Sequence, residues 1–569
     1  MIQYEKRTLN VFLAQIGETY REQKAVTFEQ GDGFTYEQLL KAVDAFDRVL
    51  TAAGVGKGDK VGLLATNSPW WAAAYFAAAA YGRVIVPILP DFTAADVENI
   101  LRHSESKALF LSSTLLHKNR EIFSHLPGLK FFALDGAAVL TADGDWPSLS
   151  FDEFNARTQS VDFSSVVERL KTQPTAEEDM AAIIYTSGTT GSSKGVMLTH
   201  RNLVSNVISA RVIPPQPETI DVSQNAALSI LPLSHTYECT IGLLTTLNRG
   251  CHIHYISKPL APTTLIPVMQ RIRPGIMLSV PLLIEKIYRK SILTTINKKA
   301  FTRALYKWAP TRKLLNRIAG KKMYRLFGGN LVFFGIGGAP LAPDVELFLR
   351  EGKFPYCLGY GLTETSPLVV GSNASDQRYR ATGHLIDDVE VRIADADPKT
   401  GEGEIQVKGP NVMKGYFKDP ERTAEVFTED GWFRTGDLGV LKKDYLYIRG
   451  RLKNVILGAS GENIYPESIE AMINEFEFVE DSLIIEDEKK TLTALVHLNM
   501  DELKKKFGDS AQAAGDYIKH IVEEVNKRLS NFSKISRSEH QKEPFEKTAT
   551  QKIKRFLYNR DSKNKGEKK

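Results

Sequence analysis

Cysteine is scarce in this sequence. The 569 residues include three cysteines, Cys239, Cys251 and Cys357, and none belongs to a C-x-x-C pair. An odd and unpaired set fits a reduced, cytoplasmic compartment better than a secreted disulfide scaffold. Each cysteine lies in an apolar or aromatic run, where a free thiol usually behaves as a small hydrophobe. We therefore assign all three to packing, the alternative being a catalytic thiol.

A secretory signal and an uninterrupted membrane span are also missing. The first residues, MIQYEKRTLNVFLAQ, lack the apolar core and cleavage site of a signal peptide, so we expect the chain to stay inside the cell. Residues 70–89, WWAAAYFAAAAYGRVIVPIL, are apolar enough to resemble a short span, but Gly82 and Arg83 interrupt them. We predict a buried, Ala-rich helix over 70–81 and a buried strand over 84–88.

No long block of one charge is apparent. The 73 Lys and Arg residues exceed the 68 Asp and Glu residues by only five, and they are spread along the chain, so nucleic acid is not implied as a partner. A hydrophobic share of 43% with 25% charged residues is ordinary for a globular protein and excludes a disordered or fibrous chain. The length is too great for one compact core, so several subdomains are expected.

The pattern of apolar runs predicts an α/β fold. Runs rich in Val, Ile and Leu begin at Val61, Ala108, Ala181 and Leu331, and each predicts a strand buried on both faces. From Gly383 the chain changes to short alternating strands, which predict a small β-rich subdomain. The remaining segment predicts strands near 482–485 and 493–498 and then a helix with Ile518, Ile521, Val522, Val525 and Leu529 on one face. We expect a large N-terminal domain of layered α/β subdomains plus the β-rich unit, residues 1–450, and a smaller α+β C-terminal domain, residues 451–569.

The strongest local motif is YTSGTTGSSKGVMLTH, residues 185–200. A predicted buried strand enters a loop of Ser, Thr and Gly, with a helix expected after it. Glycines let backbone N–H groups converge on an anion, the hydroxyls add donors, and Lys194 adds positive charge, so the loop is predicted to bind phosphates. Ser193 and Gly195 flank Lys194, which excludes the Walker A pattern of kinases and GTPases. A flexible Ser/Gly linker is the alternative.

This loop resembles the YTSGTTGxPKG signature of the adenylate-forming family, which contains acyl-CoA synthetases, luciferases and peptide-synthetase adenylation domains. Ser193 stands where the family usually has proline. The resemblance continues in the family's order through LPLSHTYECT (231–240), GIGGAPL (335–341), GYGLTETSP (359–367), WFRTGDLG (432–439), RGRLKNVILGASGENIYPESIE (449–470) and EKTATQKIKRF (546–556). It therefore covers nearly the whole chain and implies the fold of acyl-CoA synthetases and luciferases, with a mobile C-terminal domain.

The resemblance also implies site residues. For nucleotide binding they are Thr186, Ser187, Gly188, Thr189, Thr190 and Lys194 in the loop, Gly338, Ala339, Pro340, Tyr360 and Gly361 around the adenine, and Asp437 and Arg451 on the ribose. For catalysis they are Lys552, Thr363, Glu364 and His235, although a lone His is more often structural. Glu364 and Thr186 are the implied ligands of Mg²⁺.

The implied reaction joins a carboxylic acid to AMP with release of pyrophosphate and then transfers the acyl group to coenzyme A. In the family the C-terminal domain rotates between the two steps, here about Lys453. Two positions differ from the family pattern. Gln551 stands where relatives have a glycine, and Asn454 stands where many relatives have an acidic residue. The LPLSHTYE form and an insertion over 280–335 resemble long-chain fatty-acid synthetases. Within that insertion Leu282, Leu283, Ile287 and Tyr288 could line an apolar tunnel, and core packing would explain them equally.

Two other functions are left open. A ligase that passes the acyl group to a carrier protein would share these motifs, and Asp481-Ser482-Leu483 superficially resembles a phosphopantetheine site on a predicted strand. A pseudoenzyme that only binds ATP is less consistent with the retained Lys552. The expected partners are the fatty acid, ATP, Mg²⁺ and coenzyme A, with no nucleic acid. The basic C-terminal tail could draw the chain to anionic membranes, or simply keep it soluble. No pattern indicates an oligomeric state.

Overall fold

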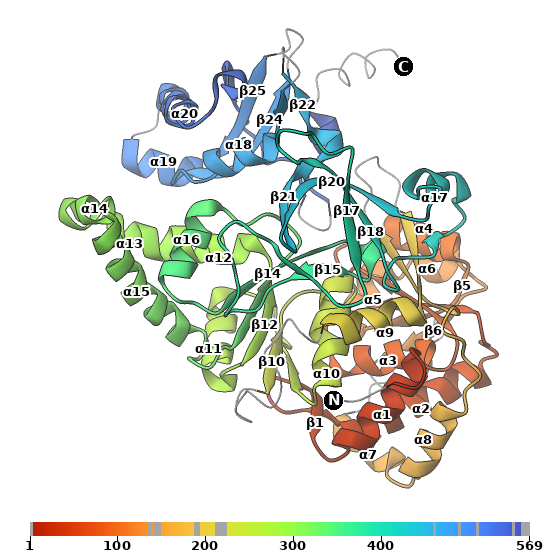
Figure 1. Ribbon diagram of the computed structural model, residues 1–569. Helices are drawn as coiled ribbons and strands as arrows, with labels where there is room; N and C mark the ends of the chain where they lie inside the picture. Colours follow the sequence, from red (N-terminus) through yellow and green to blue (C-terminus); the bar gives the residue numbers. More distant parts are fainter. Residues whose placement is uncertain are drawn as a thin grey trace.

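The computed structural model describes residues 4–134, 138–140, 150–186, 194–210, 225–458, 462–486, 491–507, 511–548 and 552–558. It has the mixed α/β architecture that the apolar runs predict, with two large sheets, surrounding helices and a smaller C-terminal unit (Figure 1). Within these ranges no helix has both the length and the apolar character needed to cross a membrane.

The first large sheet has thirteen strands. Their order is β17 (Glu390–Ala394), β18 (Gly403–Lys408), β20 (Phe433–Lys442), β21 (Tyr445–Arg451), β16 (Gly383–Leu385), β15 (Leu368–Gly371), β14 (Tyr356–Gly361), β13 (Phe333–Ile336), β12 (Ile276–Ser279), β10 (Ala226–Ser229), β11 (His252–Tyr255), β1 (Lys24–Phe28) and β2 (Gly33–Thr35). β14 pairs in parallel with β13 and antiparallel with β15. The antiparallel strands after Gly383 therefore extend the parallel sheet through β14 instead of forming a sheet of their own.

The second large sheet has eight strands. Their order is β19 (Gly415–Tyr416), β9 (Lys194–Thr199), β8 (Met180–Thr186), β4 (Val84–Ile88), β3 (Lys60–Leu64), β5 (Ser106–Leu111), β6 (Lys130–Ala133) and β7 (Ala138–Leu140). The central strands β8, β4, β3, β5 and β6 are parallel. Among them, β3, β5 and β8 contain the apolar runs that begin at Val61, Ala108 and Ala181, and β4 is the strand predicted over 84–88, whereas the run at Leu331 forms β13 of the first sheet.

The alanine-rich segment forms the predicted helix and strand. Helix α3 (Pro69–Ala79) begins at the Ser68 cap, whose hydroxyl accepts from the Trp71 N–H at 3.1 Å, and Pro69 occupies the first turn, where its missing N–H is not needed. Every residue of α3 is buried, as expected for a helix that is apolar on all sides. β4 follows as a fully buried central strand.

The prediction of a helix directly after the Ser/Thr/Gly loop is wrong. A strand, β9, comes first and pairs antiparallel with β8, from Thr186 opposite Lys194 to Met180 opposite Thr199. Helix α9 (His200–Ser209) begins only after it, capped by Thr199. The loop thus joins two antiparallel strands, and β9 separates it from the start of α9.

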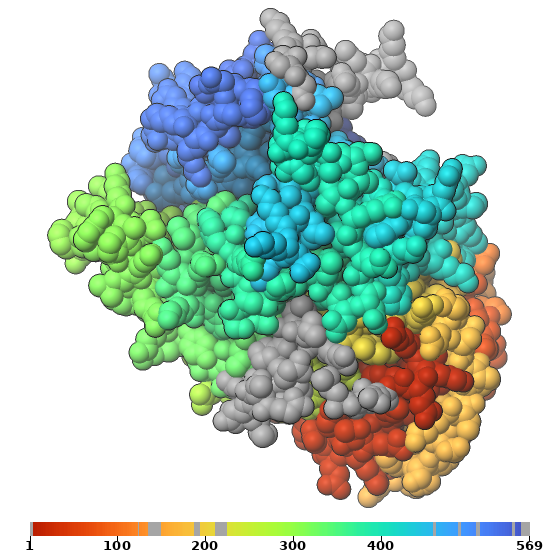
Figure 2. All heavy atoms as spheres, viewed as in Figure 1, coloured from red at the N-terminus to blue at the C-terminus, as the bar shows by residue number. Residues whose placement is uncertain are grey.

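The C-terminal unit contains the two predicted strands, β24 (Val479–Glu486) and β25 (Leu492–Leu498), joined by β26 (Arg537–His540) and a separate pair, β22 (Ile456–Leu457) and β23 (Asn463–Ile464). Its helices are α18 (Pro466–Ile473), α19 (Met500–Phe507) and α20 (Ala511–Asn526). The predicted apolar face of α20 packs on these strands, although Leu529 lies beyond the end of the helix. Figure 2 shows this unit, in blue, packed against the green and cyan surface of the larger part.

Candidate active site

Three of the predicted nucleotide-binding residues meet between β14, β20 and β21. The Tyr360 hydroxyl donates to Asp437 Oδ2 at 2.8 Å, and Arg451 Nε lies 2.9 Å from Asp437 Oδ1. Asp437 and Arg451 lie directly opposite each other on β20 and β21, so the strand register keeps the carboxylate and the guanidinium side by side. Burial raises the pKa of Asp437, whereas Arg451 and the Tyr360 hydrogen bond lower it. The result is a buried carboxylate with a cation and an aromatic ring beside it.

A second group forms around the turn after β14. Thr363 and Glu364 lie in a 3₁₀ turn (Thr363–Thr365), and the Tyr416 hydroxyl donates to Glu364 Oε1 at 2.8 Å. Lys194 Nζ lies 4.8 Å from the centroid of the Tyr416 ring. Burial lowers the pKa of Lys194, and the Glu364 charge opposes that shift. Tyr416 therefore joins the phosphate-loop lysine to the predicted Mg²⁺ ligand.

Tyr416 was missed by the sequence analysis. It lies on β19, whose pairing with β9 (Tyr416 opposite Val196) carries it to the base of the hairpin. Its only signal is an aromatic residue in the segment MKGYF, 52 positions after Glu364. A local motif search cannot assign such a residue, because its role depends on a long-range strand pair.

The phosphate loop itself is described only at its ends. Thr186 closes β8 and Lys194 opens β9 opposite it. Ser187, Gly188, Thr189 and Thr190 lie outside the described residues, so their predicted contacts remain predictions.

The predicted adenine segment follows β13. Gly338 has a φ of +86°, a conformation that favours glycine, and Gly338, Ala339 and Pro340 are exposed at the surface of the site. A Cβ at Gly337 would lie 3.3 Å from the Tyr237 ring, so the chain passes closely over that ring. Gly361 cannot be replaced by a residue with a side chain, because a Cβ there would lie 1.7 Å from the Pro367 backbone oxygen.

Lys552 comes from the other end of the chain and reaches the same place. Its backbone is held by Thr548, whose N–H donates to the Lys552 carbonyl at 2.8 Å. Desolvation by the surrounding protein and then the Arg451 charge lower the pKa of Lys552. The carboxylates of Asp437 and Glu364 act in the opposite direction. The C-terminal lysine and the N-terminal carboxylates thus interact across the boundary between the two units.

His235 lies near this group as well. Its Nδ1 accepts from the Tyr237 N–H at 3.2 Å, which leaves Nε2 as the protonated nitrogen of a neutral ring. Burial and the nearby Lys552 charge lower its pKa to about 4, so the ring is uncharged at neutral pH. The Thr236 hydroxyl lies 3.4 Å from the Thr363 hydroxyl and links this segment to the turn after β14.

Glu364 and Thr186 fit a metal that arrives with a nucleotide. In the part of the chain that the structure describes, no three His, Cys, Asp or Glu side chains gather as a ligand set. Mg²⁺ usually takes one or two protein oxygens and completes its shell with water and phosphate. A single carboxylate beside the predicted phosphate loop is enough for a Mg²⁺ ion that is bound mainly by phosphate and water. It is too few for an ion bound by protein ligands alone.

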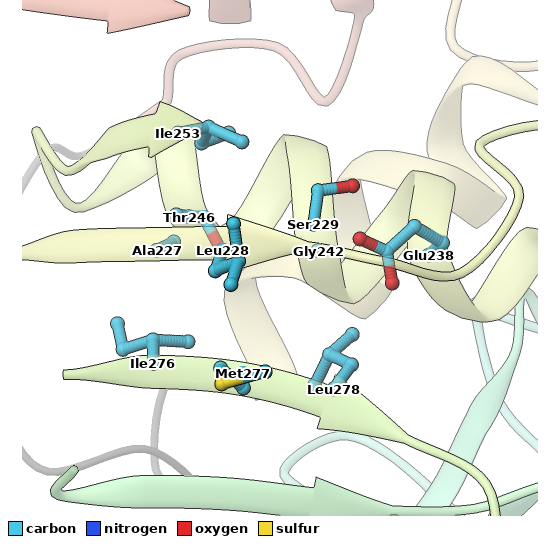
Figure 3. A pocket seen from close by; sticks show the side chains of 10 residues that line it. All are labelled: Ala227, Leu228, Ser229, Glu238, Gly242, Thr246, Ile253, Ile276, Met277 and Leu278. Atoms are coloured by element: carbon cyan, nitrogen blue, oxygen red, sulfur yellow. The ribbon is translucent and has the colours of Figure 1, made fainter. Parts of the chain in front are cut away.

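A small cavity lies under the π-helix η4 (Tyr237–Thr245). β10 and β12 form its floor (Figure 3). The volume within which the centre of a water molecule could lie is about 10 Å³. Glu238 projects into it from η4, and Oε2 of its buried carboxyl has no hydrogen-bond partner. Burial raises the pKa of Glu238 to about 8, while Ser229 opposes the shift by hydrogen bonding. Glu238 is therefore a neutral acid at pH 7, and sequence reasoning did not single it out.

The insertion residues proposed for a tunnel divide into two groups. Tyr288 is buried and packs 4.9 Å from Phe348 between ring centroids, while Leu283 and Ile287 pack against the same core. Leu282 is 43% exposed. Core packing therefore explains three of the four side chains.

Comparison with known proteins identifies the family of this chain. Residues 13–417 match the model of the AMP-binding enzyme family, and residues 453–563 match that of the AMP-binding enzyme C-terminal domain. Long chain acyl-CoA synthetase 7, peroxisomal, of Arabidopsis thaliana is 30% identical over 90% of this chain and 75% of its own length. Long-chain-fatty-acid--[acyl-carrier-protein] ligase AEE15, chloroplastic, of the same plant is 28% identical over 83% and 73%. The crystal structure of ATP-bound MatB from Rhodopseudomonas palustris shares the fold, with a TM-score of 0.72 at 23% identity over 98% of this chain and 99% of its own. The chain belongs to the family of AMP-binding enzymes.

Proposed function

We propose that this enzyme activates a long-chain fatty acid with ATP and transfers it to coenzyme A. The observation that carries the proposal is that Lys552 of the C-terminal unit lies close enough to Asp437, Glu364 and Arg451 for their charges to shift its pKa, because this would bring a cation to the proposed nucleotide site. The substrate class is supported by the relative named as a long-chain acyl-CoA synthetase, which matches over most of both chains.

In the first step the fatty-acid carboxylate attacks the α-phosphorus of ATP, forming a C–O–P bond while pyrophosphate leaves. Both reactants are anions, so positive charge must be held ready at the reaction centre. Lys552 and Lys194 supply such charge, and the neutral His235 adds none. A bound Mg²⁺ would neutralise phosphate charge, with Glu364 and Thr186 as its protein ligands.

The nucleoside would be held by the Tyr360, Asp437 and Arg451 group. A carboxylate has about four lone-pair sites, and two of them are occupied by Tyr360 and Arg451 in this structure. The others remain for the ribose hydroxyls. Holding the nucleotide in place lets positioning supply much of the rate enhancement.

In the second step the C-terminal unit rotates about Lys453, withdraws Lys552 and admits the thiol of coenzyme A, which displaces AMP from the acyl group. The proposed domains are residues 1–450 and 451–569, and the start of the second family match at residue 453 supports that boundary. Polar contacts join the units, including the Tyr465 hydroxyl donating to Glu402 Oε2 at 2.7 Å. Single hydrogen bonds of this kind can exchange with water at modest cost.

A carrier protein is the second candidate acceptor, because one relative is named as a ligase to acyl-carrier protein. A carrier site within this chain is disfavoured. Ser482 of the Asp481-Ser482-Leu483 segment is buried on β24, and its hydroxyl donates to Asn474 Oδ1 at 2.8 Å. A phosphopantetheine arm needs an exposed serine, so any carrier would be a separate protein.

The test supplies purified enzyme with Mg²⁺, ATP and saturated fatty acids of graded length, with coenzyme A, with a phosphopantetheinylated carrier protein, or with neither. Products are identified by mass spectrometry. Acyl-CoA and AMP are expected, with a maximum rate at long chain lengths. Acyl-adenylate that persists with coenzyme A but disappears with the carrier would transfer the assignment to the carrier ligase. Failure to form acyl-adenylate from any fatty acid would refute the proposal.

A further inference from the structure

Two helices of the 280–335 insertion present an exposed apolar and basic surface. They are α14 (Ala300–Tyr306) and α15 (Ala309–Leu326), seen in light green at the edge of the molecule in Figures 1 and 2. Phe301, Trp308, Leu314 and Ile318 are 73%, 63%, 61% and 60% exposed. Large apolar side chains with this exposure are costly in water and indicate a surface that contacts something else when they cluster.

The charge of this segment is entirely of one sign. Residues 286–325 contain thirteen of the chain's Lys and Arg residues and none of its Asp and Glu residues, so the expectation of evenly spread charge is wrong here. The rest of the chain is consequently net negative. Among the described residues, only Arg289 and Arg312 of these thirteen make ion pairs, with Asp344 and Glu351. The other eleven charges are available to a partner.

Helix geometry places the apolar and basic side chains on the same outward face. Leu314 and Ile318 are one turn apart, and Lys313, Arg317, Lys321 and Arg325 repeat at four-residue spacing beside them. The opposite face is buried through Asn316, Gly320 and Met323, and a Cβ at Gly320 would lie 2.5 Å from the Gly352 carbonyl. This close backbone contact fixes which face α15 turns outward.

We propose that the surface formed by α14 and α15 docks on an anionic lipid membrane. Lys and Arg side chains are attracted to a negatively charged leaflet, while Trp and Phe favour its interface and aliphatic side chains enter the acyl boundary. Nucleic acid would use the basic residues but cannot bury Leu314 and Ile318. A symmetric dimer through this face would place like charges opposite each other. The lipid surface is the partner that satisfies both kinds of side chain.

Membrane docking is separate from the chemistry of acyl activation, and vesicle binding can be measured without catalytic turnover. It also differs from the expectation that the C-terminal tail meets the membrane, since the tail is a separate part of the chain. Fatty acids partition into membranes, so docking by the insertion would bring the enzyme to its proposed substrate.

The experiment is cosedimentation of the full chain with phosphatidylcholine vesicles that contain 0% or about 30% phosphatidylserine, at low and high salt. Wild-type enzyme is expected to bind the anionic vesicles at least about tenfold more tightly, and high salt should weaken that binding. The combined changes Lys313→Gln, Arg317→Gln, Lys321→Gln and Arg325→Gln should remove most of the preference. The changes Trp308→Ser, Leu314→Ser and Ile318→Ser should weaken binding at either salt concentration.

Matched controls keep the result specific. Lys399→Gln, Lys442→Gln, Lys443→Gln and Lys534→Gln remove four exposed charges elsewhere, and Lys563→Gln, Lys565→Gln, Lys568→Gln and Lys569→Gln remove charge from the tail. Both sets should retain vesicle binding, and all variants should keep the wild-type circular dichroism and melting temperature. The proposal is overturned if the wild-type enzyme does not bind the vesicles or if either control set loses vesicle binding as the surface variants do. It is also overturned if the surface variants bind vesicles like wild type and lose only oligonucleotide binding or self-association.

Discussion

The Tyr360 hydroxyl donates a 2.8 Å hydrogen bond to Asp437 Oδ2, so the aromatic ring predicted to pack on adenine and the carboxylate predicted to bind ribose are in direct contact. Arg451 holds the other carboxylate oxygen. The ring orientation, the carboxylate and the cation therefore depend on one another. A change at Asp437 should therefore disturb the whole proposed nucleoside site and not a single hydrogen bond.

Asp437→Asn should lower kcat/KM for ATP in the adenylation step by roughly ten- to hundredfold, because hydrogen bonds to charged groups contribute about 1.5–3 kcal/mol. Asparagine keeps the size of the side chain and removes its charge. Pyrophosphate release at varied ATP concentration measures the effect. Asp430→Asn is the matched control, since Asp430 forms an exposed pair with Arg392 away from the site. Equal losses in both variants would contradict the assignment.

Lys552→Ala should reduce acyl-adenylate formation by about a hundred- to thousandfold, the range seen when one stabilising donor is removed from a reaction centre. Thioester formation from supplied acyl-adenylate should be nearly unchanged, because the proposed rotation of the C-terminal unit withdraws Lys552 in that step. Lys554→Ala is the control on the same segment, where the lysine pairs with Glu546 at 3.6 Å. Equal loss of both half-reactions would show that Lys552 has another role.

Much of the fold could be predicted because the signals are local. The all-apolar helix α3 and the strands at the centre of the second sheet follow from composition and length alone. The C-terminal strands β24 and β25 were placed within a few residues for the same reason. In the site, the family resemblance, and not the local pattern alone, indicates Tyr360, Asp437 and Arg451, and the structure brings these three residues together.

The parts that sequence reasoning missed depend on contacts between distant segments. The GVMLT run after the loop could have continued into a helix, but β9 is held in place by β8 and by β19, which lies more than 200 residues away. The role of Tyr416 follows from that pairing. The state of Glu238 could not be inferred either, because burial by β10 and β12 raises its pKa and is invisible in its own segment.

Arg289→Ala should weaken the docking of the C-terminal unit. Arg289 Nη1 donates to the Glu475 carbonyl at 3.1 Å, and its guanidinium also pairs with Asp344 at the start of α16 (Pro343–Glu351). Loss of this link should slow adenylation by about two- to twelvefold, the equivalent of about 0.5–1.5 kcal/mol for one hydrogen bond, and leave thioester formation from supplied acyl-adenylate unchanged.

Arg312→Ala provides the comparison for Arg289. Arg312 lies in the same insertion and pairs with Glu351 at 2.9 Å, and among the described residues it forms no hydrogen bond or ion pair with the C-terminal unit. Any loss of stability that it causes should affect both half-reactions alike. If Arg289→Ala changes the two half-reactions in the same ratio as Arg312→Ala, the docking role is refuted.

Glu238→Gln should change how stability depends on pH. Burial raises the pKa of Glu238 from its ordinary value of 4.5 to about 8 in the folded chain, so between these values the folded state keeps a proton that the unfolded state has released. Stability from this group is therefore complete below pH 4.5 and is lost as pH rises towards 8, by up to about 1.4 kcal/mol per pH unit. Glutamine resembles the neutral acid and does not titrate, so thermal melts from pH 5 to 8 should show the variant gaining on wild type as pH increases. Glu178→Gln, at an exposed position, should follow wild type throughout. Parallel curves for wild type and Glu238→Gln would mean that Glu238 is ionised in the folded enzyme.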